Sequence, residues 1–134
     1  MSPVLTTTQT PLPIIGETAR TARQHMLTIG LEDYFQVGAF QKLIERNFWD
    51  RFESRLERST HTTLDLLDRY DAKATFFVLG WVAEQLPELI REVADRGHEV
   101  ASRGFYHRNI RDLTRDEFRD DLARTREADR KSVV

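Results

Sequence analysis

The segment from Gly97 to His107, GHEVASRGFYH, constrains the fold of this chain most strongly. Gly97 suits the left-handed backbone conformation that commonly follows the last residue of a helix. Val100-Ala101 is small and apolar, which favours a short covered strand of a parallel sheet. Arg103 and His107 would then follow the carboxyl end of that strand, where α/β proteins place ligands and catalytic groups. The segment therefore predicts an α/β fold with a polar site at this end of the sheet.

The spacing of Arg103 and His107 is a second clue to the kind of site. The two residues are four positions apart, so in a helical turn both side chains would leave from one face. Two histidines at such a spacing could hold one metal ion. Here one of the two positions is arginine.

The remainder of the chain alternates short apolar runs with helical patterns. We expect strands at 26–31 and 74–79 before the strand near 100, and helices at 60–70, 81–96 and 114–128. Pro87 would start a second part of the middle helix. Thr114 and Glu117 form a capping box before the last helix, in which Phe118 and Leu122 would share a face. This order of elements implies a parallel sheet with helical crossovers.

Composition narrows the class of protein. A chain of 134 residues suits one modest domain, and 40% hydrophobic with 31% charged residues is typical of a soluble globular protein. The formal net charge of -2 gives no basic surplus for nucleic acid. The absence of cysteine excludes disulfides and thiolate metal sites. We expect a cytoplasmic protein, because no apolar run suits a membrane span or a signal peptide. Residues 1–24 read as a flexible leader and 129–134 as an irregular tail.

Two adjacent carboxylates, Glu32 and Asp33, follow the first predicted strand. One could hold a metal ion while the other acts as a base. The alternative is a pair that caps the following helix. Spacing alone favours the cap, whereas the expected position of His107 at the same edge of the sheet favours a site.

Four short sequence motifs together resemble those of one protein family. These motifs are SRGFYH at 102–107, LEDYFQV at 31–37, KATFFVLGWVAE at 73–84 and GHEVAS at 97–102. Together they resemble the polysaccharide deacetylases, the NodB-homology domain of carbohydrate esterase family 4. They are most similar to the branch associated with exopolysaccharide and exosortase loci. The resemblance covers about 27–126. It implies the N-terminal half of a distorted (β/α) barrel, with a partial NodB-homology domain at 25–128.

The resemblance also implies a chemistry and a set of residues. In this family an Asp-His-His triad holds a divalent metal, usually zinc, and the enzymes remove acetate from N-acetylated sugars by hydrolysing an amide C–N bond. Asp33 and His107 match two metal ligands, and Glu32 matches the catalytic base. Arg103 stands where the first metal histidine belongs. Gly30 stands where this branch usually has an aspartate, so either Glu32 or that missing aspartate is the base, and in the second case Glu32 could be a metal ligand.

These departures from the family's pattern lead to one hypothesis about Arg103 and to three alternatives for the function of the chain. Arginine keeps its charge in proteins, so Arg103 would repel a divalent cation and pair with Asp33 or Glu32 in its place. The chain also stops before the family's later motifs, so we expect a truncated, impaired deacetylase-like protein with open sheet edges that favour self-association. A degenerate domain that binds a sugar, a partner or nothing is the second alternative. A receiver-like signalling module is the third, but the chain lacks the later Thr and Lys pattern of such modules.

Overall fold

A computed structural model describes residues 24–133, so residues 1–23 of the predicted leader lie outside the described residues. The three strands are β1 (Thr28–Leu31), β2 (Thr75–Val78) and β3 (Glu99–Ser102). The four α-helices are α1 (Leu56–Arg69), α2 (Gly80–Gln85), α3 (Pro87–Asp95) and α4 (Arg115–Val133). Short 3₁₀ segments occupy η1 (Tyr34–Gln36), η2 (Gly38–Phe40), η3 (Arg46–Arg51) and η4 (Ile110–Asp112).

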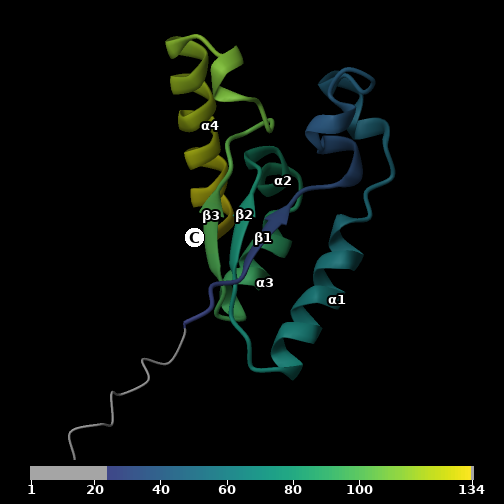
Figure 1. The fold of residues 1–134 in the computed structure, drawn as a ribbon, viewed down its shortest axis with the longest axis vertical. Helices are drawn as coiled ribbons and strands as arrows, with labels where there is room; N and C mark the ends of the chain where they lie inside the picture. The colour runs from purple at the N-terminus through teal and green to yellow at the C-terminus, as the bar shows by residue number, and fades with distance from the viewer. Residues whose placement is uncertain (1–23, 134) are drawn as a thin grey trace, which may run out of the picture.

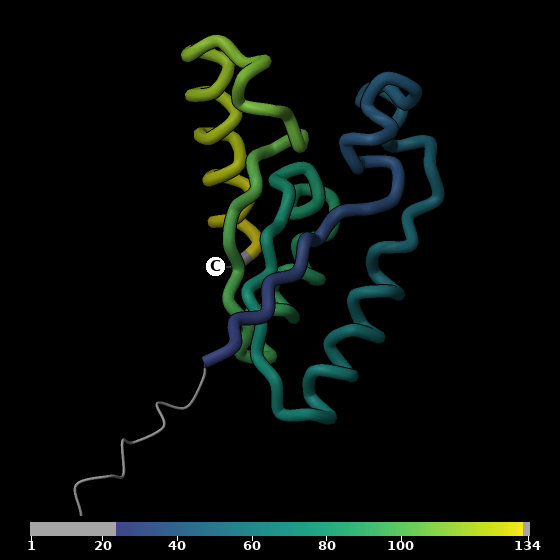
Figure 2. The backbone as a smooth tube through the Cα atoms, in the orientation of Figure 1, coloured from purple at the N-terminus to yellow at the C-terminus, as the bar shows by residue number. Residues whose placement is uncertain are grey.

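The strands form one parallel sheet in the order β1-β2-β3. Figure 1 shows the arrows running in one direction, and Figure 2 traces the helical crossovers that return the chain between them. Gly30 lies opposite Phe77 in the register, and Phe77 lies opposite Ala101. The alternating α/β fold and the parallel sheet predicted from the sequence are thus confirmed.

The helices cover one face of this sheet. Phe76 and Val78 are fully buried in the core that the helices share, whereas Phe77 between them is 37% exposed. Successive side chains of a strand point to opposite faces, which explains the alternation. The face of β2 that carries Phe77 is therefore partly open, because no described helix packs on it.

The middle helix is divided as the sequence indicates. Pro87 is the first residue of α3, where its missing N–H costs no helical hydrogen bond. Leu89, Ile90 and Val93 turn the apolar face of α3 into the core. A short helix and a longer one therefore carry the chain from β2 to β3.

The last helix is longer than predicted. It continues to Val133 instead of ending near Ala128, so the irregular tail expected at 129–134 is wrong over the described part of that range. The extension is stabilised by Ser132, whose buried hydroxyl donates to the Ala83 and Ala128 carbonyls. The hydrogen bonds of Ser132 thus stabilise α4 beyond the point where its apolar pattern ends.

The face that α4 packs also differs from the prediction. Leu122 is 46% exposed, while Thr125, Ala128 and Ser132 are buried. A Cβ at Gly80 would lie 3.0 Å from the Thr125 Cα, so α4 passes very close to the start of α2. Small residues suit this close approach, and the expected Phe118 and Leu122 face does not form the contact.

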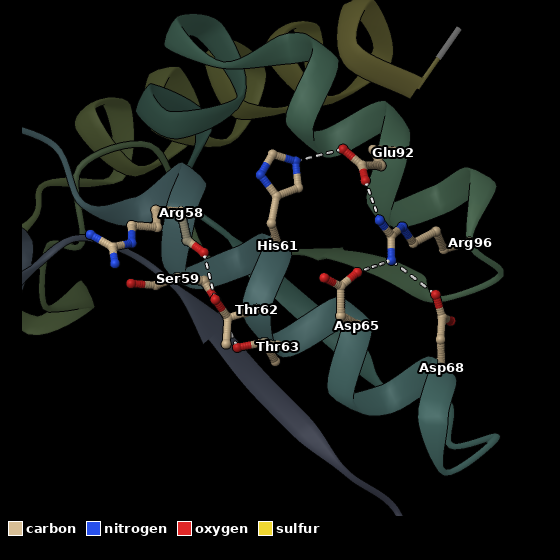
Figure 3. Close-up of polar contacts among 9 residues, drawn as sticks. All are labelled: Arg58, Ser59, His61, Thr62, Thr63, Asp65, Asp68, Glu92 and Arg96. Carbon is tan, nitrogen blue, oxygen red and sulfur yellow. Dashed lines mark hydrogen bonds and ion pairs between the residues drawn. The ribbon is translucent and has the colours of Figure 1, made fainter.

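A polar network joins α1 to α3 on the surface (Figure 3). His61 Nε2 lies 2.8 Å from a Glu92 oxygen, and Arg96 donates to Asp65, Asp68 and Glu92. His61 in the first turns of α1 is therefore paired with Glu92 of α3. The hydrogen bond from His61 is the largest cause that lowers the pKa of Glu92.

Over residues 24–133, no helix combines the length and the apolar character needed to cross a membrane.

Candidate functional site

Three charged or titratable side chains meet beyond the carboxyl ends of the outer strands. Glu32 follows β1 directly, and Arg103 and His107 come from the loop after β3. Arg103 Nη1 donates to Glu32 Oε1 at 2.7 Å, and Arg103 Nη2 lies 3.1 Å from His107 Nε2. His107 Nδ1 lies 2.6 Å from Glu32 Oε2. The sequence prediction that these residues share one edge of the sheet is confirmed.

The loop brings Arg103 and His107 together by a route that the sequence analysis did not predict. The segment is not helical; Gly104 and His107 both have positive φ, of 78° and 54°. A left-handed conformation is uncommon for a residue with a side chain and often marks a functional or strained position. The two side chains therefore meet because the loop turns back, and the helical turn that would have placed them on one face does not form.

The surroundings of His107 determine which ring nitrogen carries a hydrogen. Nδ1 faces Glu32 Oε2 and also the Gln36 carbonyl oxygen at 3.1 Å, and both of these atoms are acceptors. A hydrogen on Nδ1 satisfies this arrangement and leaves Nε2 to accept from Arg103. The Gln36 carbonyl is the hydrogen-bond acceptor for Nδ1, Glu32 Oε2 lies close to Nδ1 without hydrogen-bond geometry, and Arg103 covers the second nitrogen.

Asp33 points into a different set of contacts. Its carboxylate accepts from the backbone N–H of Tyr34 at 2.9 Å, from Ser54 Oγ at 2.7 Å and from the Arg55 N–H at 2.9 Å. The residue is only 5% exposed and caps η1. This is the geometry of the capping alternative, and none of these bonds goes to Arg103 or His107.

The residues present do not fit a catalytic zinc ion. Such a site needs about three protein ligands and an open position. Among the residues that the structure describes, no group of three or more His, Asp or Glu side chains could hold a metal ion. Glu32 and His107 offer two donors, and the guanidinium of Arg103 contacts both of them. Arg103 therefore pairs with Glu32, one of the two partners that the sequence hypothesis named.

Two residues that support the site were missed from the sequence. The Gln36 side chain accepts from the Asp33 N–H at 2.7 Å, and the Gln36 carbonyl faces His107. Asp33 and Gln36 are three residues apart, which is the spacing of a capping box and could have indicated this turn. Ser54 gives no such signal, because it reaches Asp33 across 21 residues of chain.

An open hollow of about 760 Å³ is lined by the two chain neighbours of His107, although Glu32, Arg103 and His107 themselves do not line it. Trp81 and Tyr106 line it together with a segment at 41–47 and Arg108. The guanidinium of Arg46 stacks over the Tyr106 ring at 4.9 Å. Aromatic rings beside polar groups offer the kind of surface on which a sugar ring can pack.

A parallel α/β sheet with polar side chains beyond the carboxyl ends of its strands is an architecture in which many enzymes place their sites. The particular family is shown by the sequence: residues 45–132 match the profile described as polysaccharide deacetylase, and the chain belongs to this family. The matched range contains Arg103 and His107 but begins after Glu32 and Asp33. The resemblance to the polysaccharide deacetylases is confirmed, while the exopolysaccharide-associated branch and the bounds of 25–128 for the domain stay predictions.

Similar proteins are named as deacetylases of peptidoglycan sugars. The chain is 35% identical over 68 residues to a peptidoglycan-N-acetylglucosamine deacetylase of Bacillus cereus, covering 51% of this chain and 25% of that protein. It is 30% identical over 79 residues to the peptidoglycan-N-acetylmuramic acid deacetylase PdaA of Bacillus subtilis, covering 58% and 30%. The chain thus spans less than a third of the length of these relatives.

A solved structure supports the fold. A family 4 carbohydrate esterase from Streptomyces lividans, determined in complex with acetate, superimposes with a TM-score of 0.59. The match covers 80% of this chain and 44% of that chain at 23% identity, so it bears on the fold alone. The described elements correspond to part of a (β/α) barrel, as the sequence predicted.

Proposed function

We propose that this chain acts as a polysaccharide deacetylase, a hydrolase that cleaves the amide C–N bond of N-acetylated sugars. The observation that carries the proposal is the 2.6 Å approach of Glu32 Oε2 to His107 Nδ1, in a chain of the polysaccharide deacetylase family. The proposed substrate is an N-acetylated polysaccharide or oligosaccharide, the class that the names of the relatives give.

The reaction needs a group that takes a proton from water and a group that gives one to the departing amine. Glu32 and His107 are the proposed pair, with the Glu32 carboxylate 2.6 Å from the imidazole and the Gln36 carbonyl orienting the ring. Water adds its oxygen to the acetyl carbon, the C–N bond breaks, and the amine leaves with a proton. We further propose that the rate is low, because Arg103 covers the Nε2 atom that would exchange this proton.

The test is the release of acetate from a chitin oligosaccharide by the full chain and its variants. Glu32→Gln and His107→Asn should each lower the rate by at least about 100-fold, the usual contribution of a positioned acid or base. Glu53→Gln removes an exposed carboxylate elsewhere and is the control. Equal rates in all four proteins would refute the assignment.

A second candidate is a domain that binds N-acetylated sugars without hydrolysing them. The 2.7 Å ion pair between Arg103 and Glu32 favours it, because it engages the proposed base. Trp81 lines the neighbouring hollow, so tryptophan fluorescence can report binding of the same oligosaccharide. A saturable fluorescence change without acetate release would select this candidate over the first.

Three finer predictions accompany the proposal. The family is generally metal-dependent, and zinc is the ion that we expect a restored site to take, with Arg103→His supplying the third ligand beside Glu32 and His107. The cytoplasmic location and the self-association through sheet edges also stay predictions. Size-exclusion chromatography with light scattering tests the last of these.

A further inference from the structure

Gly30 of β1 faces the guanidinium of Arg103. A Cβ built on Gly30 would lie 2.6 Å from Arg103 Nη1, and 3.8 Å from both Arg103 Cζ and Glu32 Oε1. At 2.6 Å the end of the flexible Arg103 side chain would have to shift, and the cost of that shift is the contact that Nη1 makes with Glu32. The guanidinium therefore occupies the space that any side chain at position 30 would need.

The backbone itself gives no reason for a glycine here. Among the described glycines, positive φ is found at Gly97 and Gly104, and Gly30 is not one of them. Glycine in a strand costs stability, because it loses more conformational freedom on folding than other residues and has no side chain to pack. The room that Gly30 leaves for Arg103 is the structural reason that remains.

We infer that Gly30 and Arg103 form a complementary pair that replaces a metal ion with a cation of the chain itself. The missing side chain at position 30 lets the guanidinium reach Glu32 at 2.7 Å and His107 at 3.1 Å, the two groups that offer metal donors. The positive charge that balances Glu32 is thus built in. The inference rests on the proposed function only in taking Glu32 and His107 as the remains of a metal site. The pairing of Gly30 with Arg103 rests on the distances given above.

A double-mutant cycle tests the pairing through stability. Gly30→Ala in the parent must displace Arg103 Nη1 and disturb its ion pair with Glu32. This loss offsets the stability that alanine adds to a strand relative to glycine. In an Arg103→Ala background the same substitution should only increase the stability of the protein. The two effects on the unfolding equilibrium constant should therefore differ by about fivefold or more.

The matched control is Gly38→Ala, where an added Cβ meets no atom within 4 Å. Its effect should be equal in both backgrounds. Where Arg103→Ala is too unstable to measure, Arg103→Gln gives the same cycle, since its shorter side chain leaves the space over Gly30 open. Equal effects of Gly30→Ala in both backgrounds would overturn the inference.

Zinc binding gives a second readout that does not depend on activity. Native mass spectrometry of the full chain with added zinc should show no bound ion in the parent and one in Arg103→His. One tightly held zinc ion in the parent would overturn the inference. Failure of acetate release would remove the proposed function and leave the stability cycle intact, so the two failures are distinguishable.

Discussion

Replacing Asp129 by asparagine should stabilise this protein at neutral pH and do so in a pH-dependent way. Asp129 lies on α4 with its Oδ1 atom buried and without a hydrogen-bond partner. Burial raises the pKa of this carboxyl from 3.8 to about 6. The folded state therefore holds the proton more tightly than the unfolded state, so stability falls as the pH rises from about 4 through 6.

The magnitude follows from the size of the shift. About two pKa units correspond to about 3 kcal/mol of lost stability at pH 8, since each unit is worth about 1.4 kcal/mol. Asparagine has nearly the same shape and no charge, but its amide still has buried hydrogen-bonding groups. We therefore expect Asp129→Asn to be about 1–3 kcal/mol more stable than the parent at pH 8 and no more stable at pH 4.

The assay is urea unfolding followed by circular dichroism at one-unit steps from pH 4 to pH 8. Asp120→Asn, an exposed position on the same helix, is the control and should give a difference from the parent that does not change with pH. The reasoning is refuted if the difference between Asp129→Asn and the parent is constant across this range.

Three further predictions concern buried or capping groups. Asp33→Ala should lower the free energy of unfolding by about 2–4 kcal/mol without any metal present, because two backbone N–H groups and the Ser54 hydroxyl lose their acceptor; an unchanged urea midpoint would contradict the capping role. Burial lowers the pKa of His98, so the parent should lose stability as the pH falls from 7.5 to 5.5, and His98→Asn should lack this part of the loss in the same titration. Thr114→Ala should cost about 1 kcal/mol by removing the acceptor of the Glu117 N–H, whereas loss of helicity at the end of α4 alone would argue against the capping box.

Local patterns were sufficient to predict much of the fold. The three apolar runs became the strands, Pro87 divided the middle helix, and Thr114 with Glu117 formed the expected capping box. His98, predicted to be a packed residue at the entry of a strand, is 5% exposed. Each of these features depends on residues close together in the chain, so the sequence contains the whole signal.

The site depended on contacts that short patterns do not contain. Asp33 turns away to Ser54 and Arg55, which lie 21 and 22 positions further along the chain. Arg103 and His107 meet through left-handed residues and not through a helical turn. The edge of the sheet could therefore be predicted, but the direction of each side chain could not.

The order of the strands also bears on how the chain folds during synthesis. Each strand of the sheet pairs with the strand made just before it, since the order in space equals the order in sequence. The β1–β2 pair can form once the residues up to Val78 have left the ribosome, and β3 then adds at the free edge without displacing an earlier strand. Synthesis therefore never requires a strand that has already paired to leave its neighbour.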